Sequence, residues 1–204
     1  SEEMSILTDS LPVSISIRGQ EVGINSGFRA SLSFEEMLMQ RLSEEELLQN
    51  ILNIYLDDRW RNLPADCLSE LLDQIGWFYR CGRESPRKQQ GSANKGQVLS
   101  YEHDAPYIYA AFLQCDIDLQ KEPELHWWRF RAVLESLPDE CKLMQIIRIR
   151  SIKIDGDMSR KEKEYYRKMK KLYAIPSTVQ KTERQKEIER ILMEGGDLSQ
   201  LNHE

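Results

Sequence analysis

The stretch LHWWRFRAVLESLP, Leu125–Pro138, decides much of the expected fold because it places two adjacent tryptophans on one predicted helix. Neighbouring helical positions point about 100° apart, so a single buried stripe cannot hold both indoles at its centre. With Trp127 at the origin of a helical wheel, Phe130 lies near about 300° and Leu134 near about 340°. These positions form one apolar face. We expect that face in the core, together with Ile146 and Ile147 of the next predicted helix.

The second indole lies off that face, at about 100° on the wheel. Trp128 is flanked there by Arg131 and Glu135 on one side and by Ala132 on the other. Two explanations are open: a second element of the protein covers the indole, or a partner protein does. Large aromatic side chains are favoured as interface anchors. Trp128, with Arg131 beside it, is therefore a candidate partner-binding pair.

The composition is that of a globular protein, with 204 residues, 40% hydrophobic and 30% charged. No run approaches the roughly 20 apolar residues of a membrane span. The N-terminus lacks the basic start and apolar stretch of an export signal, so we expect a cytoplasmic protein without membrane partners. Four widely spaced cysteines are expected to be free thiols: Cys67, Cys81, Cys115 and Cys141.

Charge is distributed unevenly along the chain. Residues 1–80 carry 14 acidic and 6 basic side chains, whereas residues 158–190 carry 11 basic and 5 acidic ones. A basic segment on an acidic body indicates either a charged partner or contact between the two ends.

A β-hairpin is expected near the N-terminus, because apolar residues alternate on either side of a turn at residues 18–20. The alternating positions are Val13, Ile15, Ile17, Val22 and Ile24.

The remaining elements are predicted to be helices, from apolar periodicity and capping patterns. Four of them are expected at residues 28–41, 125–137, 139–150 and 178–193. Two more are expected to begin after the N-caps Ser43 and Asp104. The other two run from near Pro64 through Tyr79 and from the N-cap Ser159 to Tyr173. The fold class is therefore mainly α, a compact helical domain with a short N-terminal β-hairpin.

Domain boundaries follow a polar stretch, GRESPRKQQGSANKG at residues 82–96, which has no apolar residue larger than Ala93. We expect a mobile loop or linker at 82–98, between an N-terminal part at 1–81 and a C-terminal helical part at 99–194. The two parts are expected to pack as one domain or as two closely associated lobes. Residues 195–204 are expected to be a disordered tail.

No arrangement of residues indicates chemistry. The chain lacks a nucleophile elbow, a phosphate-binding glycine loop and the paired histidines of a zinc protease. Asp155 and Asp157 resemble the start of a calcium loop, but Arg160 and Tyr166 occupy the positions that need glycine and glutamate. We expect no catalytic residue, no metal and no cofactor, and hence a protein that is not an enzyme.

The basic helix SRKEKEYYRKMKKLYA places Lys163, Arg167 and Lys170 on one face, with tyrosines interleaved. Phosphate binding requires such charge. Solvated lysines on an amphipathic helix need no ligand, however, and the whole chain is acidic. Nucleic acid is therefore disfavoured, and the three cations are candidate partner-binding residues.

Several runs are specific enough to compare with known families. They are LTDSLP, IRGQEVGINSGFR, YEHDAPYIYAAFL, LHWWRFRAVLESLP, MQIIRIRSIKI and KEKEYYRKMKKLYAIP. In this order, over about residues 5–193, they resemble the bacteriophage gene-product-fifteen family of long-tailed phages.

The resemblance implies a tail-module protein without enzymatic activity, acting in the bacterial host cytoplasm during phage assembly. Its position in that module is typical of tail assembly chaperones, which are thought to coat the tape-measure protein before the tube polymerises. The implied partners are the tape-measure protein and the tail-tube protein. One small domain cannot cover a long helical client, so we also expect the protein to oligomerise or to wrap around it. Two alternatives remain: a structural tail component retained in the virion, and a nucleic-acid-binding protein that uses the basic helix.

Overall fold

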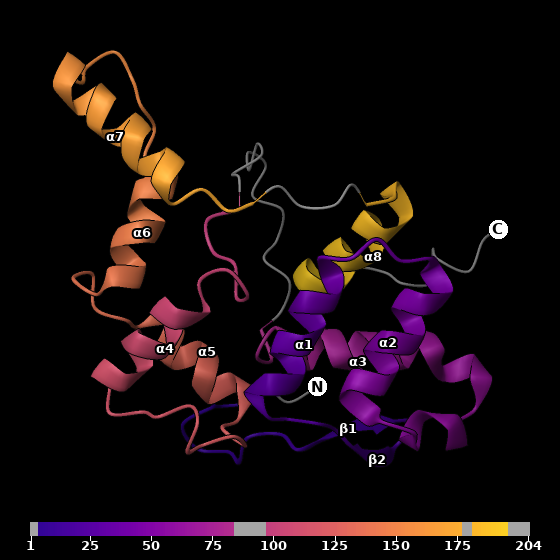
Figure 1. Ribbon diagram of the computed structural model, residues 1–204. Helices are drawn as coiled ribbons and strands as arrows, with labels where there is room; N and C mark the ends of the chain where they lie inside the picture. The colour runs from indigo at the N-terminus through magenta and orange to yellow at the C-terminus, as the bar shows by residue number, and fades with distance from the viewer. Residues whose placement is uncertain (1–3, 84–96, 177–180, 196–204) are drawn as a thin grey trace. The chain divides into compact units, whose positions relative to one another are not determined.

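The computed structural model describes residues 4–83, 97–176 and 181–195. These residues form eight α-helices, two short 3-10 helices and a β-hairpin (Figure 1). The predicted mobile loop and disordered tail lie almost wholly outside the described residues. In the described part of the chain, no helix has both the length and the apolar character needed to cross a membrane. The mainly α class with an N-terminal hairpin is confirmed.

The chain divides into two compact units, and neither is continuous in sequence. The first contains residues 4–83, 123–131 and 181–195 of the described chain, and the second contains 97–122 and 132–176. The chain passes from the first unit to the second within the predicted linker, and it returns to the first unit at 123–131 and at the last helix. The 123–131 segment belongs to the first unit because its backbone pairs there: Gly27 forms a β-bridge with His126, and Trp127 N–H donates to Ser26 O at 2.8 Å.

The hairpin consists of β1 (Ser14–Ile17) and β2 (Gln20–Gly23), paired antiparallel. Its two turn residues, Arg18 and Gly19, both have positive φ, 50° and 78°, as in the type I′ turns that match strand twist. Four of the five predicted apolar positions are buried: Ile15, Ile17, Val22 and Ile24. Val13, which precedes β1, is 64% exposed.

Three helices form the body of the first unit: α1 (Phe28–Leu38), α2 (Glu44–Leu56) and α3 (Leu68–Tyr79). The predicted capping box at Ser43 and Glu46 is present, with both hydrogen bonds formed. Two 3-10 helices, η1 (Arg59–Asn62) and η2 (Ala65–Cys67), connect α2 to α3, so the turn predicted at Pro64 is 3-10 rather than α. Strand β1 packs against α3, which covers the hairpin.

The last helix, α8 (Glu183–Glu194), packs against α3 and α2. It begins at Glu183 because the Thr182 side chain accepts from the N–H of Gln185 as an N-cap, and it ends at Gly195 as predicted. The expected start at residue 178 lies outside the described residues. Gly76 permits the close approach to α3, since a Cβ there would lie 3.2 Å from Leu192 O.

The second unit contains α4 (Ala105–Gln114), α6 (Lys142–Ser151) and α7 (Arg160–Leu172), with α6 in contact with both others. Helix α5 (Trp127–Glu135) runs from the first unit into the second. The four cysteines are free thiols, as expected. The predicted capping box at Ser159 and Glu162 is present on α7.

A buried ion pair organises the second unit. Arg150 donates to both carboxylate oxygens of Asp104, at 2.6 and 2.8 Å, and to the carbonyls of Val98 and Tyr173. Burial opposes ionisation of Asp104, but Arg150 and the Ser100 N–H outweigh it, so the pKa of Asp104 lies below its ordinary value. Asp104 precedes α4 as predicted, but its side chain binds Arg150 instead of capping the helix.

Replacing Asp104 by Asn should destabilise the fold by roughly 3–5 kcal/mol, because it leaves the guanidinium buried without its counter-charge. The exposed pair of Asp139 and Arg148 offers a matched control, where Asp139→Asn should cost less than about 1 kcal/mol. Since the folded-state pKa of Asp104 is lowered, its contribution is full above pH 3.8 and falls as pH drops through the folded value. Urea unfolding of both variants at several pH values measures their free energies of unfolding. Equal losses of unfolding free energy in the two variants would contradict the prediction.

Candidate partner-binding surfaces

Trp127 lies in the core, as the wheel predicts. Its side chain is 0% exposed, and its ring stacks on Phe130 at 5.6 Å between centroids. The indole N–H donates to the carbonyl of Tyr79 at 2.9 Å. Phe130 and Ile146 are also buried as expected. Leu134 and Ile147, also predicted core residues, are only half-buried. The predicted apolar face therefore includes more residues of the second unit than its core buries.

Trp128 is also buried, at 2% exposure, so the first of the two explanations holds: another element of the protein covers it. Its indole N–H donates to the carbonyl of Phe78 at 2.8 Å, and its ring meets Trp77 edge-on. Gly82, with φ +71°, lies directly over the indole; a Cβ there would approach a ring carbon to 2.8 Å. The expectation of an exposed anchor at Trp128 is therefore wrong.

The adjacent tryptophans share one structural role. The last carbonyls of a helix have no partner within the helix. Phe78 and Tyr79 end α3, and each receives one indole N–H. The backbone already caps this end of α3, since Cys81 N–H donates to Phe78 O at 3.0 Å and Gly82 N–H donates to Trp77 O at 2.9 Å. The Trp-Trp pair adds two indole donors to this cap.

His126 extends this cap to the N-terminal segment. The Trp128 N–H donates to His126 Nδ1 at 3.1 Å, so the ring proton resides on Nε2, which donates to Pro12 O at 2.8 Å. Burial lowers the pKa of His126, with a contribution from nearby Arg129, against the opposing effect of the Pro12 carbonyl. The fold therefore requires the neutral imidazole.

Arg131 is half-buried and faces the interior of the first unit. Its guanidinium lies 5.5 Å from the centroid of Trp127 and also interacts with Glu35. Glu35 accepts a hydrogen bond from Tyr79 Oη, yet burial raises the pKa of its carboxyl overall. Arg131 is therefore a structural cation here, and its predicted role at a partner interface remains a prediction.

The predicted basic face of α7 is also largely structural. Lys170 donates to Arg150 O at 2.8 Å, and Lys163 donates to Gly156 O at 3.3 Å. Of the three predicted cations only Arg167 is exposed without such a bond among the described contacts. The turn before α7 is an Asx turn, in which Asp157 N–H donates to Asp155 Oδ1, as expected once the calcium loop is rejected.

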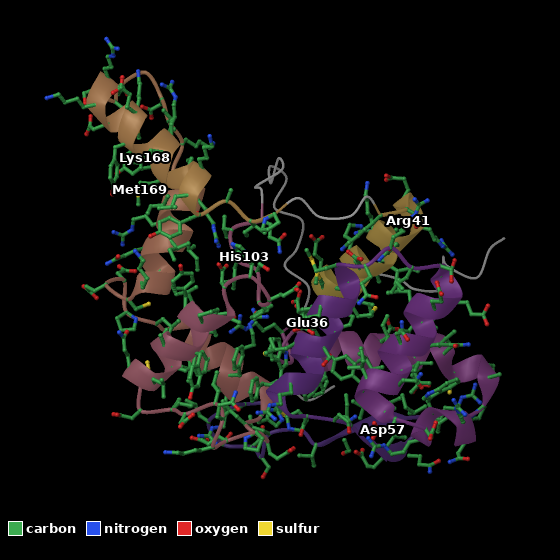
Figure 2. All side chains as sticks on the ribbon, in the orientation of Figure 1. Glu36, Arg41, Asp57, His103, Lys168 and Met169 are labelled. Carbon is green, nitrogen blue, oxygen red and sulfur yellow. The ribbon has the colours of Figure 1, made fainter. Side chains whose placement is uncertain are left out.

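Helix α7 exposes apolar side chains in addition to the predicted basic ones. Tyr165 is 53% and Leu172 65% exposed, although both are large apolar side chains. Lys161 and Lys168 beside them are exposed as well. Figure 2 shows the side chains that project from α7, including Lys168 and Met169. The helix presents an apolar edge lined by lysines.

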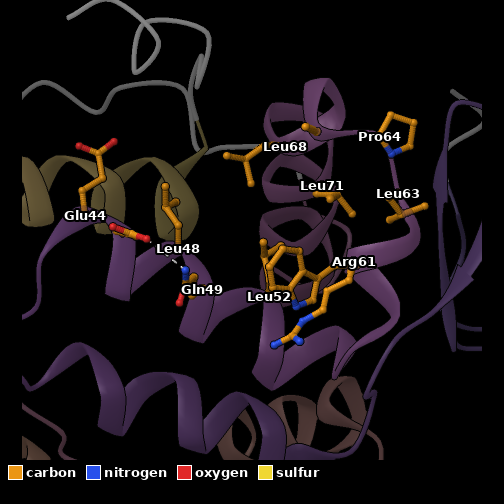
Figure 3. Close-up of a pocket in the computed structure, with 12 residues that line it drawn as sticks. Glu44, Leu48, Gln49, Leu52, Arg61, Leu63, Pro64, Leu68 and Leu71 are labelled. Carbon is orange, nitrogen blue, oxygen red and sulfur yellow. Dashed lines mark hydrogen bonds between the residues drawn. The ribbon is translucent and has the colours of Figure 1, made fainter.

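Sequence reasoning missed an apolar groove of about 640 Å³ in the first unit, between α2 and α3 (Figure 3). Leu52 and Leu71 form its buried floor, and the half-buried Leu48, Leu63 and Leu68 form its walls. Its rim carries Glu44, Glu45 and Arg61, and Trp60, Gln49, Pro64 and Ala65 complete the lining.

A sequence signal for this groove exists. Helix α2 contains two apolar doublets, Leu47-Leu48 and Ile51-Leu52. Leu47 and Ile51 are fully buried and Leu52 is also buried, whereas Leu48 is only half-buried, so the apolar stripe extends around the helix beyond what the core covers. A stripe wider than one face indicates a second contact surface.

The fold and these surfaces describe a helical protein with an open apolar groove and an amphipathic basic helix. Among the described residues, no group of three or more His, Cys, Asp or Glu side chains could hold a metal ion. The sequence matches the family described as bacteriophage Gp15 protein over residues 7–175, and the chain therefore belongs to that family. No curated protein and no solved structure matches the sequence.

Both tryptophans should now behave as core residues. Trp127→Ala and Trp128→Ala should each cost roughly 3–5 kcal/mol, because each leaves a cavity. Trp128→Phe keeps most of the volume and removes only the indole donor, because the Phe78 carbonyl still accepts from Cys81 N–H at 3.0 Å, so it should cost about 0.5–1.5 kcal/mol. Chemical denaturation of the three variants tests this. An unchanged midpoint for Trp128→Ala would restore the exposed-anchor interpretation.

Acidification should weaken the fold through His126. Because its folded-state pKa lies below the ordinary value of 6.5, the stability it contributes is full above pH 6.5 and is lost as pH falls through the folded value. A His126→Gln variant should lose most of this pH dependence. His103→Gln, at an exposed position, should keep it. Denaturation midpoints measured from about pH 8 down to 5 decide the matter.

Proposed function

We propose that the protein is a non-enzymatic bacteriophage tail protein, an assembly chaperone that binds the tape-measure protein before the tail tube polymerises. It would act in the host cytoplasm during assembly. Membership of the phage family supports the setting. The observation that carries the binding role is the α2–α3 groove.

The groove suits an amphipathic helix. Helix-in-groove recognition places apolar anchors at i, i+3, i+4 and i+7 between two supporting helices. Here leucines of α2 and α3 face each other across the groove, and the charged side chains of its lining stand at the rim (Figure 3). An aliphatic floor with few polar groups discriminates weakly among apolar side chains. Such tolerance suits a chaperone that must bind successive segments of a long helical client.

Leu48→Glu should reduce capture of the tape-measure protein by on the order of 2 kcal/mol, because it buries a charge at the centre of the contact. Leu48 is only half-buried, so the fold should tolerate the change. Leu113→Glu, at a 44% exposed leucine in the second unit, is the matched control and should capture the client normally. The measurement is co-expression with the tape-measure protein followed by pull-down and a solubility assay of the client.

Two outcomes would defeat the proposal. If the wild-type protein and the client never copurify and the client's solubility is unchanged, the chaperone role fails. If mass spectrometry finds the protein in stoichiometric amount in purified virions, it is a structural component of the tail instead.

A further inference from the structure

The exposed edge of α7 has a repeating pattern. Tyr165 and Leu172 are seven residues apart, so they lie on the same side of the helix, separated by about 10 Å. Each follows an exposed lysine by four residues, Lys161 and Lys168 respectively. The edge thus carries two apolar side chains, each with a cation one turn before it.

The groove carries the complementary pattern. On α2, Leu48 and Leu52 follow Glu44 at intervals of four residues, and Glu45 stands beside Glu44 at the rim. The surrounding charge is also opposite in sign. Residues 44–73 contain eight acidic and two basic side chains, whereas α7 contains seven basic and two acidic ones.

We propose that α7 of one copy docks in the α2–α3 groove of a second copy. Tyr165 and Leu172 would contact the leucines of the groove, and Lys161 and Lys168 would pair with its acidic rim. Glu44 already bonds Arg184 within its own chain, so Glu45, whose one described hydrogen bond is with the Gln49 amide, is the main acceptor.

Charge favours this occupant over an arbitrary apolar helix. A helix entering the groove passes two glutamates and one arginine at the rim, within a segment that holds eight acidic and two basic side chains. Helix α7 combines an exposed apolar edge with a large excess of lysine and arginine. The contact joins two different surfaces, each present once per molecule. Such a heterologous interface continues from copy to copy and gives an open array or a closed ring.

The inference uses the groove proposed for the client but does not depend on the client. A second copy and a client helix would compete for the same leucines. Free protein would then associate with itself, and a client in excess would release single copies. Because the test below uses the purified protein alone, its failure leaves the proposed chaperone function standing.

The test is sedimentation velocity of the full-length protein across the micromolar range. The wild type should associate reversibly, and more weakly at high salt, because exposed ion pairs are screened. Leu172→Glu should raise the dissociation constant at least about fivefold, as the loss of an interface anchor does. Glu45→Lys should raise it on the order of tenfold by placing like charges together.

Two control variants match these changes. Lys153→Glu reverses the charge of an exposed lysine of the second unit that lies outside α7, and Glu36→Lys reverses a charge on α1 (Figure 2), outside the groove lining. Both should associate like the wild type. Circular dichroism confirms the fold of each variant; where Leu48→Glu fails to fold, Glu45→Lys replaces it as the groove variant.

Mixing identifies the geometry. Leu48→Glu retains an intact α7, and Leu172→Glu retains an intact groove. At a concentration where the wild type associates, each alone should associate more weakly than the wild type, and an equimolar mixture should form heterodimers with about the wild-type dissociation constant. A monomeric wild type, self-association that neither variant weakens, or a mixture that stays monomeric would each overturn the proposal.

Discussion

Two indole N–H groups at the C-terminal end of α3 are the contact on which the first unit depends. Trp127 and Trp128 donate to successive carbonyls, those of Tyr79 and Phe78. The 100° step between neighbouring helical residues, which prevents both from sharing one stripe, lets them reach two carbonyls that themselves point in different directions. The start of α5 is therefore bound to the end of α3, and a segment distant in sequence becomes part of the first unit's core.

The second unit depends on an interaction of another kind. Arg150 is bound by one carboxylate and two backbone carbonyls, and its side chain is only 6% exposed. A buried guanidinium is tolerated only when its N–H groups are hydrogen-bonded. Here the acceptors come from two segments of the unit, residues 98–104 before α4 and Tyr173 after α7. Lys170 adds a bond to the carbonyl of Arg150 itself, which ties α7 to the end of α6.

Local signals in the sequence predicted the elements well. Both capping boxes, the hairpin turn and the Gly195 stop are present, because each rests on residues close together in the chain. Long-range features were not predictable in the same way. The wheel places Trp128 off the main face correctly, but nothing in the sequence shows that the end of α3 lies there. The assignment of residues 123–131 and of the last helix to the first unit depends on such long-range contacts as well.

The predicted partner-binding residues of α7 also show what sequence periodicity cannot predict. Sequence assigns Lys163, Arg167 and Lys170 to one face by spacing, which the helix confirms, but a spacing cannot show which cations find carbonyls in their own unit. Two of the three do. Periodicity therefore predicts which side chains point in the same direction from a helix. Whether those side chains are exposed depends on the backbone groups that lie beside them.

Those two lysines also explain why α7 keeps its apolar edge outward. Lys163 and Lys170 lie on the same side of the helix and fix it against carbonyls of the preceding turn and of α6. Turning Tyr165 and Leu172 inward would rotate α7 about its axis and break both bonds, and the lysines would then have to be resolvated or re-paired. Half-buried Tyr166, Met169 and Tyr173 already occupy the inner side. The exposed pair is thus held in place by the hydrogen bonds behind it, so that the edge of α7 is a preorganised surface whose docking would cost little further ordering of the backbone.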